Sequence, residues 1–265
     1  MNRTRIKPVL LSAIFFLVTF SLSAQVNKVP NLKLYDSDPL HFGFILAANQ
    51  MDFVIKTRDD IHQIYFKGLQ IPERDLKIPA DSAMVYGVEA IPNLGFTVGI
   101  VGDKRIGEYF NLRFIPSLSF GSRELSYDVR AFSKDESTQK DTVARRVLNQ
   151  KVNSTFVEFP LYLKYKSKRV HNVRGYIYTG LKYSFDLASQ ANKTEQNNYE
   201  PKLYQSDSYY VLGAGADIYM NWFKFGVELS MSYGMRDILL RENNMYTDAI
   251  ESLKSKIFML TFTFE

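Results

Sequence analysis

Apolar and polar side chains alternate along the chain in eight separate stretches, of which residues 224–231, KFGVELSM, are typical. Successive side chains of a β-strand point to opposite faces, so each stretch predicts a strand with one apolar and one polar face. The eight predicted strands are His41–Ile55, Leu94–Val101, Phe110–Tyr127, Ser154–Lys166, Arg174–Leu187, Ser208–Met220, Phe223–Tyr233 and Ser255–Glu265.

Short and long connections alternate between these strands. Three are short, at residues 102–109, 167–173 and 221–222, and four longer ones follow Ile55, Tyr127, Leu187 and Tyr233. Bacterial outer-membrane barrels have short periplasmic turns and longer outer loops. The sequence therefore predicts an all-β fold, an eight-stranded antiparallel transmembrane β-barrel with both termini in the periplasm.

The polar face decides between this barrel and a soluble β-sandwich or lipocalin-like barrel, which would bury the apolar face instead. Charges of both signs share the polar face with glycines and serines, as expected in the narrow, side-chain-filled lumen of an eight-stranded barrel. Buried charges need partners, so we expect a polar network there. Its predicted members are Arg113, Glu158, Lys164, Lys182, Asp217, Lys224 and Glu228.

The N-terminus has the features of an export signal. Residues 1–24 combine three basic residues, the apolar run Val9–Phe20 and the small residues Ser23 and Ala24 before Gln25. This pattern predicts a cleaved signal peptide, and the run is short for an anchor helix, which needs about 20 apolar residues. We expect an extended periplasmic tail at residues 25–40 and the barrel at residues 41–265, in the outer membrane.

Composition narrows the possible partners. The net charge is +5, but the predicted signal carries three basic residues and no acid, so the remaining chain is close to neutral and does not indicate nucleic acid binding. The absence of cysteine excludes disulfides and thiolate chemistry. The aromatic content of 14% is typical of a barrel with aromatic girdles, and a large all-β enzyme can share it.

The sequence offers little for catalysis. Of the three histidines, only His62, after Asp59 and Asp60, lies in a predicted outer loop. This cluster is a weak catalytic signal, and a solvated loop explains it better. Acyl transfer and hydrolysis usually require a histidine beside a hydroxyl or carboxylate. No phosphate-binding glycine loop and no metal-ligand spacing occurs. We therefore expect no enzymatic activity, no cofactor and no metal.

One predicted periplasmic turn is strongly basic. Its candidate residues are Lys166, Lys168, Arg169, His171 and Arg174. Such a turn could dock an acidic partner or contact phospholipid headgroups. The alternative is a positively charged rim that lies beside lipid phosphates without binding a partner.

Three segments resemble a known family. They are HFGFILAANQMDF at residues 41–53, FNLRFIPSLSFGSREL at 110–125 and STFVEFPLYLKYKSKRVHNVRGY at 154–176. These segments are similar to the PorT/SprT proteins, outer-membrane barrels of the type IX secretion (Por) system, which is also linked to gliding motility. The third segment is the most specific, because it combines a strand, the basic turn and the next strand.

The resemblance implies a non-enzymatic role in exporting proteins that carry a C-terminal sorting domain, with outer-membrane lipid and other type IX secretion components as partners. A lumen filled with side chains is too narrow for a folded protein. The resemblance therefore implies an accessory or assembly component rather than the conduit. The competing prediction is a general outer-membrane barrel, either structural or a porin-like path for small solutes.

Overall fold

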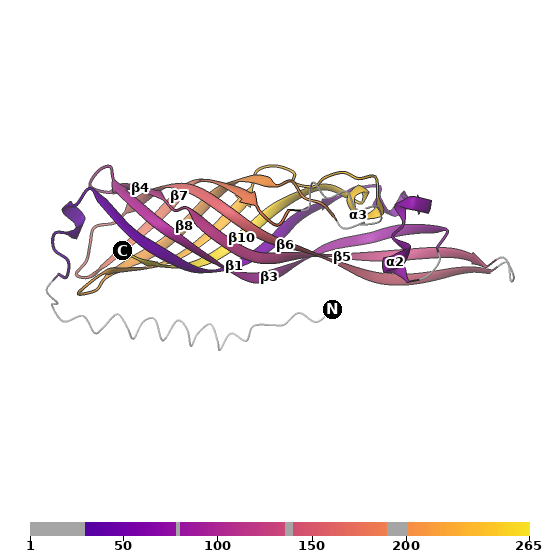
Figure 1. Ribbon diagram of the computed structural model, residues 1–265, viewed down its shortest axis with the longest axis horizontal. Coiled ribbons are helices and arrows are strands. Elements are labelled where there is room, and N and C mark those ends of the chain that lie inside the picture. The colour runs from indigo at the N-terminus through magenta and orange to yellow at the C-terminus, as the bar shows by residue number, and fades with distance from the viewer. Residues whose placement is uncertain (1–29, 78–79, 136–139, 190–200) are drawn as a thin grey trace.

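A computed structural model describes residues 30–77, 80–135, 140–189 and 201–265 (Figure 1). The predicted signal peptide lies outside the described residues. The strands are β1 (Leu40–Thr57), β2 (Phe66–Lys67), β3 (Ser82–Arg105), β4 (Phe110–Phe114), β5 (Ser117–Asp135), β6 (Lys140–Lys166), β7 (Val173–Asp186), β8 (Ser206–Tyr219), β9 (Lys224–Gly234) and β10 (Ile250–Phe264). The short helices are η1 (Tyr35–Ser37), η2 (Ile61–Gln63), η3 (Gly68–Gln70), α2 (Glu73–Leu76) and α3 (Met245–Asp248). None of these helices is long and apolar enough to cross a membrane.

The strands form a closed antiparallel barrel with eight positions in its wall, as the sequence predicts. β1 pairs with both β10 and β3, which joins the two ends of the sheet. β4 and β5 occupy one position, since both pair with β3 and β6, and they are separated only at Ile115 and Pro116. Proline has no N–H to donate to the ladder, which explains the break. The two-residue β2 pairs with β3.

The two ends of the barrel differ. At one end, named here the short-turn end, strands are joined by residues 106–109, 167–172 and 220–223, and both Leu40 and the C-terminal Glu265 lie there. At the other end, named the long-loop end, β3, β5 and β6 continue well beyond the closed barrel as a three-stranded extension (Figure 1). These names refer to the fold and not to a side of the membrane.

This extension corrects two predictions. β3 begins at Ser82 rather than Leu94, and the long loop predicted after Tyr127 is instead a hairpin, since β5 pairs with β6 from Ser117 to Asp135. The strands continue because their inner side chains, Leu125, Tyr127, Val129 and Ala131, are buried in an apolar core. The polar residues between them face outward and resemble a loop when read along the sequence.

The polarity of the two faces inverts along β5. In the barrel, Leu118 is exposed on the outer wall while Ser117 and Ser119 are buried inside. In the extension the outer face carries Asp128 and Arg130, and the inner face is apolar. An apolar outer face is suited to lipid, whereas an apolar inner face is that of a protein in water. The inversion therefore marks the edge of the lipid-facing belt.

Candidate functional site

The barrel interior contains layers of buried ion pairs. Arg113 is fully buried and contacts Glu228 at 2.7 Å, Glu265 at 3.3 Å and Asp103 at 3.5 Å. Further pairs join Lys164 to Asp217 at 2.9 Å, Lys182 to Glu158 at 2.7 Å and Lys224 to Glu265 at 2.7 Å. All seven predicted lumen residues lie inside the barrel, and each is at most 3% exposed.

Several members of this network were missed by the sequence analysis. Asp103 lies on β3, which the prediction ended at Val101, and Glu265 was not singled out at the end of the last strand. Arg123 has the same inward parity as Arg113, which is the sequence signal that places it in the lumen. It donates to the hydroxyls of Ser255 at 2.8 Å and Ser154 at 3.0 Å.

Tyrosine rings fill the space between the ion pairs. The Lys164 ammonium lies 3.5 Å from the centroid of the Tyr176 ring, and the Tyr176 hydroxyl donates to Glu228 at 2.8 Å. Gly213 on β8 lies directly against the ring of Tyr178, where a Cβ atom would collide with it. The cavity beside Glu158 and Tyr178 measures only about 20 Å³, which is room for about one water molecule.

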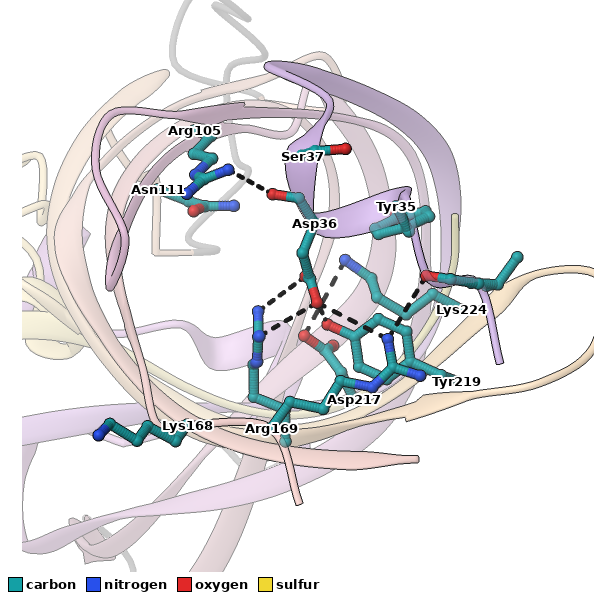
Figure 2. Close-up of polar contacts among 12 residues, drawn as sticks. Tyr35, Asp36, Ser37, Arg105, Asn111, Lys168, Arg169, Asp217, Tyr219 and Lys224 are labelled. Carbon is teal, nitrogen blue, oxygen red and sulfur yellow. Dashed lines mark hydrogen bonds and ion pairs between the residues drawn. The ribbon is translucent and has the colours of Figure 1, made fainter. Parts of the chain in front are cut away.

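The short-turn end is covered by the N-terminal segment, defined here as residues 30–39. The sequence predicts an extended tail, but residues 35–37 form η1, and Asp36 points into the mouth of the barrel (Figure 2). Arg174 donates to the two Asp36 carboxylate oxygens at 2.8 and 3.1 Å, and the Tyr219 hydroxyl donates to one of them at 2.9 Å. Arg169 lies 3.7 Å from the same carboxylate.

Tyr35 anchors the segment beside this carboxylate. Its ring stacks on His41 with centroids 3.9 Å apart, and its hydroxyl donates to Glu265 at 3.1 Å. Burial raises the pKa of the Tyr35 hydroxyl above its usual range, so it stays protonated as a donor. The mouth cavity between Tyr35, Asp36 and Lys166 measures only about 10 Å³.

The residues of the predicted basic turn therefore have different surroundings. Arg169 and Arg174 contact the N-terminal segment, and Lys166 is buried among the groups of the mouth. Of the five residues predicted for this turn, only Lys168 and His171 are exposed to solvent. His171 has a positive φ of 56°, and its carbonyl accepts from the Arg169 Nε at 2.8 Å, so its backbone shapes the turn.

The long-loop end is closed by a folded cap, defined here as the connections between strands at that end packed on the extension. Its core includes Ile61, Ile71 and Leu76 from the connection between β1 and β3, and Tyr246 from α3. The Tyr246 hydroxyl donates to Asp75 at 2.8 Å and its carbonyl accepts from Tyr127 at 3.1 Å. Both ends of the barrel are thus covered by the chain itself.

The weak catalytic candidate His62 lies on η2 in this cap. It is exposed and its ring lies 5.2 Å from that of Tyr86, while Asp60 is held by Arg58 at 2.8 Å. The arrangement brings no hydroxyl nucleophile to His62 among the contacts described. Across the described ranges, no group of three or more His, Asp or Glu side chains is suited to hold a metal ion.

A protein-family match agrees with this architecture. Residues 37–240 match a protein family described as outer membrane protein beta-barrel domain. No curated protein has a significant sequence similarity to the chain. Similar solved structures include Ail, the attachment invasion locus protein of Yersinia pestis, in complex with a heparin analogue; it is 9% identical with a TM-score of 0.36, over 86% of this chain and 98% of Ail. Another is the outer membrane protein OprG from Pseudomonas aeruginosa, 13% identical with a TM-score of 0.36, over 84% of this chain and 92% of OprG.

Proposed function

The chain belongs to this family of outer-membrane protein β-barrel domains, and from that premise we propose that it is a closed barrel that acts by binding at its ends and not by conducting solutes. The observation that carries the proposal is the lumen, where the charged groups of Arg113, Glu228 and Glu265 meet across the interior and all three are buried. A path for solutes would have to separate these groups, and an uncompensated buried charge costs several kcal/mol.

Conductance across a planar lipid bilayer tests this proposal. The protein is purified in detergent and reconstituted into the bilayer, and the current is recorded at low voltage. A porin of known conductance is the positive control. We expect no steady channels, because side chains fill the cross-section. Steady channel openings in a folded preparation would overturn the proposal and support the porin-like path for small solutes.

We further propose that the short-turn end faces the periplasm and the long-loop end the outside of the cell, after removal of residues 1–24. The chain has no cysteine, so single substitutions can report the side of the membrane. Lys67→Cys on β2 and Lys168→Cys in the basic turn are a matched pair of exposed lysines at opposite ends. In intact cells a membrane-impermeant maleimide should label only Lys67→Cys, and the opposite pattern would reverse the orientation.

A narrower function, as an accessory component of type IX protein secretion, rests on the resemblance of residues 154–176 to the PorT/SprT proteins. The filled lumen supports an accessory role over a conduit for folded cargo. Deleting the gene should leave cargo with a C-terminal sorting domain inside the cell, and re-expression should restore secretion. Normal secretion in the deletion strain would remove this narrower function and leave the general outer-membrane barrel.

A further inference from the structure

We propose that the short-turn mouth is a carboxylate-binding socket for an acidic segment of a partner protein, occupied in this structure by the chain's own Asp36. The socket consists of Arg169, Arg174 and Tyr219, whose side chains all contact the Asp36 carboxylate. Figure 2 shows Arg169 and Tyr219 beside Asp36 at the mouth of the barrel. This inference deepens the proposed binding role and rests on it, whereas closure of the lumen is tested separately by conductance.

The barrel positions Arg169 and Tyr219 of the socket independently of Asp36. The Arg169 guanidinium carbon lies 3.7 Å from the centroid of the Tyr219 ring, and the same guanidinium donates to the Asn172 side chain at 3.0 Å and the His171 carbonyl at 2.8 Å. The planar fork of arginine matches the two oxygens of a carboxylate, as Arg174 and Asp36 illustrate. Arg169 and Tyr219 are therefore preorganised by contacts within the barrel, whereas the hydrogen bonds that orient Arg174 go to the carboxylate itself.

The charges around the socket require an anion. Two arginines share the single carboxylate of Asp36, while the neighbouring Asp217 and Glu265 are engaged by Lys164 at 2.9 Å and Lys224 at 2.7 Å. Departure of Asp36 would leave two largely buried guanidinium groups without a carboxylate. A second acidic group is the natural replacement, because it restores the same charge-assisted hydrogen bonds.

The present occupant is held in a way that permits exchange. Each of residues 30–39 keeps at least partial exposure to solvent, and the side chain of Asp36 is 29% exposed. The segment is tethered to the barrel through Leu40, so it competes with any partner at a high effective concentration. A partner therefore binds weakly until Asp36 is withdrawn, which makes the segment a competitor for its own site.

The position of the socket favours a protein segment over a lipid headgroup. The side chains of Arg169 and Arg174 are each only 12% exposed, and both contact Asp36 at the mouth. Arg174 has the same parity along β7 as the buried Tyr176, so it lies on the inner and not the outer wall. Bilayer headgroups surround the outer wall, whereas an acidic loop or chain terminus can approach along the barrel axis. We therefore assign the site to an acidic segment of a water-exposed protein.

The test uses a fluorescent peptide with the sequence of residues 30–39 as the probe, with its binding to the full-length protein in detergent measured by fluorescence anisotropy. Asp36→Asn in the protein should raise the affinity for the probe at least tenfold over the unsubstituted chain. Asp38→Asn is the matched control, since Asp38 is exposed in the same segment and its backbone, not its carboxylate, makes the contact to Tyr35. Adding Arg174→Gln or Arg169→Gln to Asp36→Asn should lower the affinity at least tenfold.

Circular dichroism and the faster electrophoretic migration of unheated barrels verify that each variant is folded. Lys168→Gln, which removes an exposed charge from the same turn, should leave probe binding unchanged. A probe carrying Asp36→Asn should fail to bind.

Two results would overturn the proposed socket. One is equal affinity of the unsubstituted and Asp36→Asn proteins for the probe, and the other is probe binding that survives both arginine substitutions. Displacement of the probe by vesicles containing phosphatidylglycerol, but not by an unrelated glutamate-rich peptide, would assign the site to lipid and overturn the protein ligand.

Discussion

At the scale of single residues, Arg113 and Arg145 form ion pairs of the same length in different surroundings. Arg113 lies 2.7 Å from Glu228 with both side chains at most 3% exposed, and Arg145 lies 2.7 Å from Asp128 with its own side chain 68% exposed. Exposed pairs contribute little, because water screens them, whereas removing one partner of a buried pair leaves an uncompensated charge. The stability of the lumen therefore depends on every buried charge keeping its partner.

Arg113→Met should lower the free energy of unfolding by about 3–5 kcal/mol, since Glu228, Glu265 and Asp103 lose their shared cation. Arg145→Met is the matched control and should cost less than about 1 kcal/mol. Urea unfolding of the two variants in the same micelles, followed by tryptophan fluorescence of Trp222, measures the difference. An equal decrease in the free energy of unfolding for the two variants would contradict the conclusion that the buried lumen pairs stabilise the barrel more than exposed pairs do.

Close packing in the lumen makes a second prediction at this scale. A Cβ atom at Gly213 would collide with the ring of Tyr178, whereas one at Gly175 would lie 3.9 Å from its nearest neighbour, the Ser167 hydroxyl. Gly213→Ala should therefore destabilise the barrel by about 1–3 kcal/mol, while Gly175→Ala should be close to neutral. Thermal unfolding judged by electrophoretic migration separates these outcomes, and a neutral Gly213→Ala would argue for a looser lumen.

At the scale of elements, the three-stranded extension and its cap form a unit outside the lipid-facing belt. The alternation that predicts strands continues through β5, but its meaning reverses, because Leu125, Tyr127 and Val129 are buried on the face that is polar within the barrel. A rule that places every apolar side chain on the outer face therefore assigns the wrong faces in the extension. The boundary between belt and extension depends on whether lipid or water surrounds each segment, and the alternation alone does not predict where it lies.

Leu76→Ala should loosen the cap while the barrel remains folded. Leu76 on α2 is fully buried in the core of the cap, and removing a buried leucine side chain costs about 2–5 kcal/mol. Limited proteolysis should then cut near residues 58–77 much faster, with unchanged heat-dependent migration of the barrel. Leu187→Ala, at a position 59% exposed, is the control and should alter neither property. Simultaneous loss of barrel and cap would mean that they unfold as one unit.

At the scale of the whole molecule, three separate barriers close the barrel. The N-terminal segment covers the short-turn end, the ion pairs fill the lumen, and the cap covers the long-loop end. Because the ion pairs lie between the two covers, we expect that removing one cover does not create a path. The proposed closed barrel would then present two different end surfaces.

Deleting residues 30–38 should leave the protein without steady conductance, because Arg113, Lys224 and Glu265 still meet below the mouth. The bilayer measurement described above checks this on the shortened chain beside the full one. Channels that appear only in the shortened protein would make the N-terminal segment a gate and would contradict the role of the ion pairs as a barrier.

The sequence by itself determined the barrel, the number of positions in its wall and the face on which the lumen charges lie, because strand parity is a local property of the backbone. The tertiary structure alone decided which charges meet, since Arg113 and Glu228 are 115 residues apart. It also decided that Asp36 occupies the basic turn and that the charged hairpin after Tyr127 covers an apolar core. Those contacts depend on closure and on strand register, and no pattern along the chain encodes them by itself.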